Sequence, residues 1–411
     1  MQTSLADFIR NTPDGDEADA ILRKCVHCGF CTATCPTYQL LGDELDGPRG
    51  RIYLIKQALE GSEVTRQTQS HLDRCLTCRS CETTCPSGVQ YGRLVDIGRK
   101  VVEQRVQRRF LDQAKREALS VVLPNRMLFG AALALGRVLR PLLPSSLKAK
   151  VPLEAEPAGD WPGQRHARRM LVLAGCVQPA LAPAINASAA RVLDRLGISL
   201  FEVPSAGCCG AVRFHLNKQE AGKDDMRTLI DAWWPHVEAG VEAIVMTASG
   251  CGTTVREYAH LLKDDPEYRA KAERISGMTR DLAEIVFAER ARMQFLTSAA
   301  PKAPSRASFH SPCTLQHGQQ VRGSVEALLG DAGFELTPVA DAHLCCGSAG
   351  TYSILQPELG RRLRDNKLDS LRAGAPDTIV TANIGCLNHL QSGTDVPVRH
   401  WIQLIDERLG S

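Results

Sequence analysis

The sequence has few aromatic residues and no long apolar run. Tryptophan, tyrosine and phenylalanine together make up 5% of its 411 residues. No stretch approaches the roughly 18 apolar residues of a membrane-spanning helix, and Met1–Lys24 lacks the apolar run of a signal peptide, so we predict neither a transmembrane segment nor export. The 49 lysines and arginines nearly balance the 46 aspartates and glutamates. The formal charge of +3 is too even for a protein whose main task is nucleic-acid binding.

Motifs that bind nucleotides or present a catalytic serine are also missing. The chain contains no G-x-G-x-x-G that opens a helix after a strand, no G-x-x-x-x-G-K-[ST] and no G-x-S-x-G. We therefore expect it to hold neither flavin nor nicotinamide, so that any electron donor or acceptor lies on another molecule.

Cysteine, by contrast, is abundant, and its positions repeat. All 16 cysteines fall into two internal duplications. In the first, the spacing is 50 residues, and Cys25, Cys28, Cys31 and Cys35 match Cys75, Cys78, Cys81 and Cys85. In the second, it is 137 or 135 residues, and Cys176, Cys208, Cys209 and Cys251 match Cys313, Cys345, Cys346 and Cys386. Without an export signal, clustered thiols indicate metal or redox centres rather than disulfides.

The first duplication has the spacing of a two-cluster ferredoxin. Each copy reads C-x-x-C-x-x-C-x-x-x-C-P, and in such proteins the fourth cysteine of each run binds the other cluster. We therefore predict two [4Fe–4S] clusters, one held by Cys25, Cys28, Cys31 and Cys85 and the other by Cys75, Cys78, Cys81 and Cys35. Zinc is the alternative, but zinc sites favour separated pairs of ligands over a third cysteine at i+6 followed by Cys-Pro. A helix is expected over Pro48–Glu60 and a long one over Gly92–Leu119.

Each copy of the second duplication alternates strands with helices. Short apolar runs at Met170–Ala174, Ser199–Val203 and Ala243–Thr247 precede cysteines, and the second copy repeats the order with runs at 307–310, 334–338 and 378–382. This alternation predicts parallel sheets, whose ligands lie beyond the carboxyl ends of the strands. Helices are expected near 185–196, 219–238, 321–329 and 358–371.

The chemistry of these Cys–Cys-Gly modules stays open at this point. An additional iron–sulfur centre, a zinc site and redox-active or structural thiols are the alternatives for Cys176, Cys208, Cys209, Cys251, Cys313, Cys345, Cys346 and Cys386. His389 could complete a Cys3His set in the second copy, whereas Thr254 occupies the matching position in the first. We expect His310, His317 and His343 to be hydrogen-bonded packing residues.

The expected fold class is α+β and multidomain: a helical two-[4Fe–4S] ferredoxin-like domain followed by a duplicated α/β Cys–Cys-Gly domain. We predict a ferredoxin-type domain over 1–97, a basic helical connector and linker over 98–168, and the two modules over 169–297 and 298–411. From Ala118 to Leu153 there is no acidic residue. This basic stretch is either a solvated helix face or, with the apolar Met127–Leu139, a contact to an anionic membrane surface or an acidic partner.

Longer phrases of the sequence carry a specific resemblance. The segments CVHCGFCTATCPTYQLLGDELDGPRGRIYLIKQ, CLTCRSCETTCPSG, GCCGAV, TASGCG, SPCTLQH, HLCCGSAGTY and TANIGC resemble the iron–sulfur subunits of bacterial glycolate oxidase (glycolate dehydrogenase) over nearly the whole chain. Related iron–sulfur subunits of anaerobic glycerol-3-phosphate dehydrogenase and of heterodisulfide or quinone reductases are alternatives, as is a zinc-stabilised assembly scaffold.

The resemblance implies an electron carrier without a substrate site of its own. FAD-binding partner subunits would oxidise glycolate to glyoxylate, and also D-lactate, and this chain would pass the electrons toward membrane quinone on the cytoplasmic side of the inner membrane. Modules of this wider family often end in C-x-x-C, but Thr254 and His389 stand at the last position here. This departure argues against a five-cysteine cluster in either module.

Overall fold

The computed structural model describes residues 1–143, 148, 151–152, 154–297 and 305–410, which form two compact units. Unit 1 comprises Met1–Glu117 and His343–Leu363, and unit 2 comprises Ala118–Ala342 and Arg364–Ser411. The predicted boundary between the two modules, at 297/298, borders residues outside the described ones. The four-part division of the chain stays a prediction.

Unit 1 is helical. Its longer helices are α1 (Pro13–Lys24), α4 (Pro48–Leu59), α5 (Arg66–Asp73) and α7 (Tyr91–Arg105), and its short ones are α2 (Phe30–Ala33), α3 (Pro36–Leu41), α6 (Ser80–Thr84), α21 (Tyr352–Leu355) and a 3₁₀ turn at Glu44–Asp46. Proline opens α1, α3 and α4, where its missing N–H costs nothing. Helices α4 and α7 pack so closely that a Cβ on Gly98 would come within 2.6 Å of Ile55. Their apolar faces form the core on which the cysteine loops lie.

The predicted helix over Pro48–Glu60 is confirmed, but a single helix over Gly92–Leu119 is wrong. Helix α7 ends at Arg105, and α8 (Phe110–Val122) begins after a break. The break places the buried guanidinium of Arg108 between Asp73, at 2.6 Å, and Glu103, also at 2.6 Å. A continuous helix would satisfy the apolar periodicity but not this ion-pair network.

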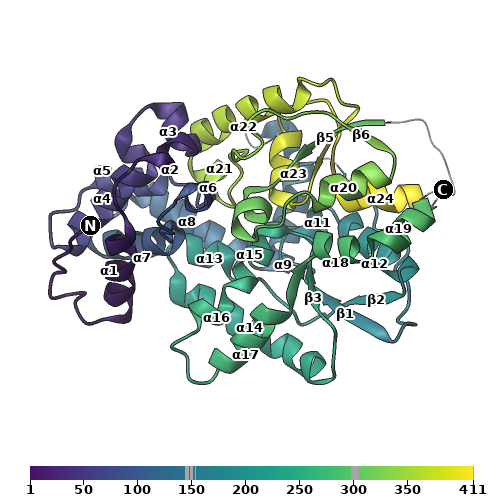
Figure 1. The fold of residues 1–411 in the computed structure, drawn as a ribbon, viewed down its shortest axis with the longest axis horizontal. Coiled ribbons are helices and arrows are strands. Elements are labelled where there is room, and N and C mark those ends of the chain that lie inside the picture. Colours follow the sequence, from purple (N-terminus) through teal and green to yellow (C-terminus); the bar gives the residue numbers. More distant parts are fainter. Residues whose placement is uncertain (144–147, 149–150, 153, 298–304, 411) are drawn as a thin grey trace. The chain divides into compact units, whose positions relative to one another are not determined.

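The described part of unit 2 contains two parallel sheets, as the sequence predicts, and each has four strands where three were expected. Strands of both sheets are labelled in Figure 1. The first has the order β2-β1-β3-β4, from β1 (Arg168–Val172), β2 (Ile198–Glu202), β3 (Ile244–Met246) and β4 (Thr279–Asp281). The second has the order β6-β5-β7-β8, from β5 (Ser305–His310), β6 (Phe334–Leu336), β7 (Thr378–Thr381) and β8 (Val398–His400). Most residues of the central strands β1, β3, β5 and β7 are buried, which is typical of parallel sheets covered on both faces.

Helices cover both sheets of unit 2. The ones that follow strands are α12 (Ala184–Arg195), α14 (Gln219–Glu238), α15 (Ser249–Arg256), α18 (Leu282–Ala288), α20 (Ser324–Asp331), α23 (Ile384–Gln391) and α24 (Trp401–Gly410). The others include α9 (Arg126–Val138), α11 (Gln178–Leu181), α13 (Ala211–His215), α16 (Tyr258–Leu261), α17 (Arg269–Met278), α19 (Arg290–Thr297) and α22 (Pro357–Arg372), which begins in unit 1. Residues of both sheets share one apolar core, and Arg191 on α12 binds Asp406 on α24 at 2.6 Å.

Among the described residues, no single helix has the length and hydropathy to cross a bilayer; only α8 and α9 together, broken between Val122 and Arg126, pass by length and composition.

Candidate metal centres

Cysteines line a cavity in unit 1 that we call cavity A. The four predicted ligands Cys25, Cys28, Cys31 and Cys85 are in its wall, and so is Cys81. The first three lie on the loop from α1 into α2, and Cys85 follows α6. Gly29 turns this loop with φ +85°, and a Cβ there would lie 2.8 Å from Arg49. The tight turn lets three sulfurs at i, i+3 and i+6 converge.

The second cavity, cavity B, is lined by Cys35, Cys75, Cys78 and Cys81. Its loop repeats that of cavity A, and Arg79, at the position of Gly29, adopts the same left-handed backbone with φ 61°. Cavities A and B share Pro48, Cys81 and Tyr91 in their walls and are therefore neighbours.

The wall residues support the predicted exchange of ligands between the two motifs. Cys35 comes from the first motif but lines cavity B, and Cys85 comes from the second motif but lines cavity A. Pro36 begins α3 directly after Cys35 and so fixes the direction in which the chain leaves cavity B. Eight cysteines line the two neighbouring cavities, and a [4Fe–4S] cluster takes four cysteine sulfurs, so the residues fit two such clusters.

Burial favours the protonated form of Cys31 and Cys81 unless a cation is bound. Burial and the neighbouring cysteines raise the pKa of Cys31 to about 11, and burial first, then Cys78 and Cys75, raise the pKa of Cys81 well above its usual value. Thiolate ligands need a metal that compensates this cost. None of the 16 cysteines, all within the described chain, forms a disulfide.

A buried charge network adjoins cavity B. Arg51 lines the cavity and donates hydrogen bonds from Nε to the His71 carbonyl oxygen (2.7 Å) and from Nη1 to Thr37 Oγ1 (3.1 Å). Thr37 Oγ1 lies 3.3 Å from Cys35 Sγ. Asp46 accepts from Arg51, from Arg74 at 2.8 Å and from His71 Nδ1 at 3.1 Å. Sequence reasoning missed Arg51, although its place one helical turn before Ile55 on α4 puts it on the apolar face.

In the first Cys–Cys-Gly module, four cysteines converge inside unit 2. Cys176 Sγ and Cys208 Sγ are 3.8 Å apart, and Cys209 has both Cys208 and Cys251 as neighbours. The hydrogen bond with Cys176, then that with Cys209, lowers the pKa of Cys208, while the hydrogen bond with Cys208 and burial raise the pKa of Cys176. Gly210 has φ +83°, and a Cβ there would meet Gly222 O at 2.4 Å, so only glycine lets α13 pack here. The predicted ligand set of this module is thus gathered in one place.

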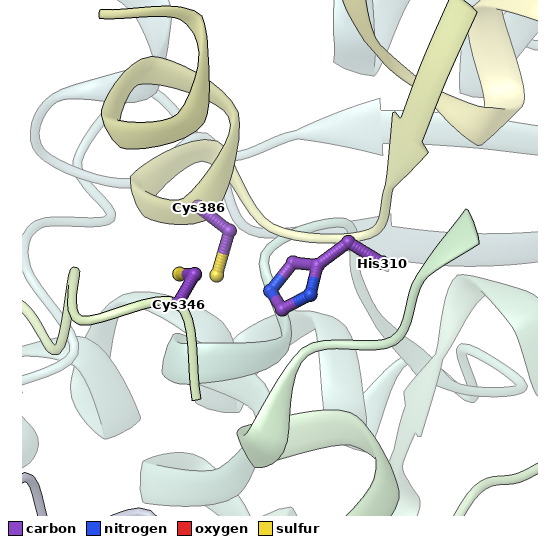
Figure 2. Close-up of side chains that lie close together, drawn as sticks. All are labelled: His310, Cys346 and Cys386. Carbon is purple, nitrogen blue, oxygen red and sulfur yellow. The ribbon is translucent and has the colours of Figure 1, made fainter. Parts of the chain in front are cut away.

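In the second module, a histidine joins the cysteines. His310 at the end of β5 and Cys386 on α23 have ligand atoms within 4.8 Å of one another, and Figure 2 shows the two side chains, with Cys346 also drawn. Neither ring nitrogen of His310 has a hydrogen-bond partner among the described residues, and burial, with Lys367 and His389, holds its pKa well below the usual value. The prediction of a hydrogen-bonded packing residue is therefore wrong for His310. Leu173 occupies the equivalent position in the first module, so the duplication itself contained the signal.

Cys345 and Cys346 lie on the segment of unit 1 that spans His343–Leu363. Gly347, with φ +84°, donates from its backbone N–H to Cys345 Sγ at 3.4 Å. His389 is buried on α23. The role of these residues and of Cys313 as ligands of the second module stays a prediction.

Comparison with known proteins agrees with this arrangement. Residues 21–89 match the family of 4Fe-4S dicluster domains, and residues 170–256 and 307–391 match the cysteine-rich CCG domain. The chain is 56% identical over 409 residues to the glycolate oxidase iron–sulfur subunit of Escherichia coli K12, covering 100% of this chain and 99% of that protein.

More distant relatives share the same parts. A probable glycolate oxidase iron–sulfur subunit of Bacillus subtilis is 29% identical over 404 residues, covering 91% of this chain and 89% of the relative. Lactate utilization protein A of an Exiguobacterium species is 25% identical over 238 residues, covering 56% of this chain and 94% of that protein.

Proposed function

Because the chain belongs to the family of glycolate oxidase iron–sulfur subunits, we propose that it carries electrons from a partner FAD subunit, which oxidises glycolate to glyoxylate and also D-lactate, toward membrane quinone. The observation that carries this proposal is the pair of adjacent cavities lined by all eight cysteines of the two motifs. When bound, a [4Fe–4S] cluster accepts and releases one electron at a time. The chain's part is to hold the thiolates, exclude water from cavity B and keep the two sites next to each other.

The absence of a nucleotide-binding motif from the sequence supports a flavin on a partner. A 2-hydroxy acid loses two electrons in its oxidation, which reduced flavin can then release singly to one-electron acceptors. We therefore assign no substrate site to this chain.

Anaerobic reconstitution with iron and sulfide analysis tests the cluster assignment. We expect about eight irons and eight acid-labile sulfides per chain, and zinc without sulfide would overturn it. Adding the chain to the flavin subunits should then restore glycolate-dependent reduction of quinone. Restoration by a chain stripped of iron would refute the electron-carrier role.

Helix α9 supports a peripheral contact with the cytoplasmic face of the inner membrane. Its apolar side chains Met127, Leu135 and Val138 are exposed, and the acid-free sequence around it carries Arg126, Arg137 and Arg140. An amphipathic segment of this kind inserts its apolar side chains at the lipid interface while the cations bind anionic headgroups.

Vesicle sedimentation tests this contact. The chain should bind phosphatidylglycerol vesicles more than phosphatidylcholine vesicles, and the triple variant Met127→Ser, Leu135→Ser, Val138→Ser should lose binding. Phe287→Ser, which removes an exposed apolar side chain elsewhere in unit 2, is the matched control. Equal loss in both variants would contradict a specific role of α9.

A further inference from the structure

The internal duplication makes cavities A and B comparable position by position, and they differ in exposure. Val26 and Phe30, beside cavity A, are 69% and 61% exposed. Their equivalents beside cavity B, Leu76 and Ser80, are 6% and 2% exposed. The loop of cavity A is thus the more exposed one, with the exposed Cys28 at its centre, whereas the equivalent Cys78 in the loop of cavity B is only partly exposed.

The charges around the two cavities differ as well. Arg49, at cavity A, pairs with Glu44 at 2.6 Å, and both side chains are partly exposed, so water and the partner carboxylate weaken its field. Cavity B has Arg51 and Arg79 in its wall. The buried Arg99 donates to the backbone oxygen of Cys75 at 2.7 Å and so adds a third cation.

Few carboxylates offset the cations at cavity B. Asp46 contacts both Arg51 and Arg74 directly, so one carboxylate is shared between two guanidinium groups. Glu82 accepts from Gly92 N–H near Arg79. Four arginines and two carboxylates therefore leave an excess of positive charge at cavity B. At cavity A, the Met1 ammonium donates to the Cys25 carbonyl oxygen at 2.9 Å and Arg49 pairs with Glu44, but these groups are partly exposed, so water screens their charges more strongly.

The segment His343–Leu363 of unit 1 contributes to the burial of Arg51. Arg362 on this segment donates to the carbonyl oxygen of Leu40 at 3.3 Å, in helix α3, which begins directly after Cys35. Tyr352 is 5% exposed, and the charged groups that act on its hydroxyl include Arg51, Cys75 and Cys345. The guanidinium of Arg51 is thus shielded from water, and its field is little screened.

We propose that Arg51 is a positioning residue that holds the cluster of cavity B at a more positive reduction potential than the cluster of cavity A, so that electrons enter at the exposed cavity A and come to rest in cavity B. The potential of an iron–sulfur cluster depends on nearby charge, hydrogen bonds and solvent exposure. Burial alone favours the less charged, oxidised form, and the excess of fixed cations at cavity B opposes this effect. The inference rests on the proposed function, because it requires both clusters.

An anaerobic redox titration followed by electron paramagnetic resonance tests the proposal on the full chain. The wild type should show two transitions. Arg51→Gln should shift the more positive one to lower potential and leave the other in place, while the matched variant Arg49→Gln should leave the more positive one in place. Arg51→Lys keeps the charge and should keep the more positive transition near its wild-type value.

Two results would overturn the inference: a single wild-type potential, or an Arg51→Gln protein with iron and sulfide intact whose transitions do not move relative to each other. If Arg51→Gln does not retain its clusters, the test is the comparison of the wild type with Arg51→Lys. A more positive transition that moves to lower potential in Arg51→Lys, where the charge is kept, would contradict a charge effect. Absence of any cluster signal from the wild type would instead refute the proposed function.

Discussion

Asp46 and Arg51 form an ion pair of 3.4 Å in which both side chains are 1% exposed. Two charges so deeply buried stabilise a fold only when each keeps its partner, because a single buried charge is costly. The pair joins the 3₁₀ turn Glu44–Asp46 to the first turn of α4 and so fixes the wall of cavity B.

Removing the carboxylate should therefore destabilise unit 1. Asp46→Asn keeps the shape of the side chain but leaves Arg51 without its counter-charge, and we expect a loss of about 3 to 5 kcal/mol in the free energy of unfolding. The measurement is anaerobic urea unfolding followed by far-ultraviolet circular dichroism. Asp19→Asn, which breaks the exposed pair with Arg23, is the control and should cost at most about 1 kcal/mol. Equal effects of the two substitutions would contradict a special role of the buried pair.

Exchange of ligands between the two motifs makes a pairwise prediction about cysteine variants. Cys25→Ser and Cys85→Ser should alter the same paramagnetic signal, because both sulfurs line cavity A. Cys75→Ser and Cys35→Ser should alter the other signal. Cys251→Ser, in unit 2, should leave both signals unchanged. If Cys35→Ser groups with Cys25→Ser instead, each motif binds its own cluster and the assignment is wrong.

Regular spacing explains which parts of the structure could be predicted. The repeat of four cysteines and the proline after each run predicted both cavity linings, and apolar periodicity predicted α4 and α14 within a residue at each end. Strands β4 and β8 were missed because they are three residues long and carry polar residues such as Arg280 and Arg399.

Other features depend on tertiary contacts that no local pattern encodes. The break after α7 follows from the ion pairs of Arg108, whose partners Asp73 and Glu103 lie on other segments or turns. Burial of His310 next to Cys386 depends on the pairing of β5 with β7, which brings residues 76 positions apart together. Spacing within one motif cannot report such contacts.

Asp281 predicts a loss of stability as the pH rises from about 4 to about 7. Its carboxyl caps α18, accepts from Ala283 N–H at 3.0 Å and is fully buried, and burial raises its pKa to about 7. Because the pKa is higher in the folded than in the unfolded protein, the stabilisation is present at low pH and is lost as the pH rises through about 7. We expect the free energy of unfolding to fall by about 1.4 kcal/mol between pH 6 and pH 8 from this group.

Urea unfolding at both pH values, followed by tryptophan fluorescence, measures this loss, since all four tryptophans lie in unit 2. Asp281→Asn keeps a capping oxygen and should remove this part of the pH dependence. A slope that is unchanged in the variant would show that other groups cause it.

His400 predicts the opposite trend on the acid side. Its Nε2 donates to the Thr247 carbonyl oxygen at 3.0 Å, and its Nδ1 accepts from Ile402 N–H at 3.3 Å, so the ring is held in one neutral tautomer. Burial lowers its pKa to about 4, below the value in the unfolded chain. The stabilisation is therefore present above about pH 6.5 and is lost as the pH falls through 4, by about 3 kcal/mol in total.

His400→Gln separates protonation from packing. The glutamine amide can keep the donor to Thr247 but does not titrate, so the variant should lose about 1 kcal/mol at pH 7.5 through poorer packing and hydrogen bonding. Between pH 7.5 and pH 5 its stability should then fall less than that of the wild type. Tryptophan fluorescence during urea unfolding again reports on unit 2, where Trp401 is the next residue in the chain. If wild type and variant lose stability in parallel, His400 is not the group that limits stability in acid. The loss of stability must then come from protonation of another side chain, because only a titrating group links unfolding to proton uptake.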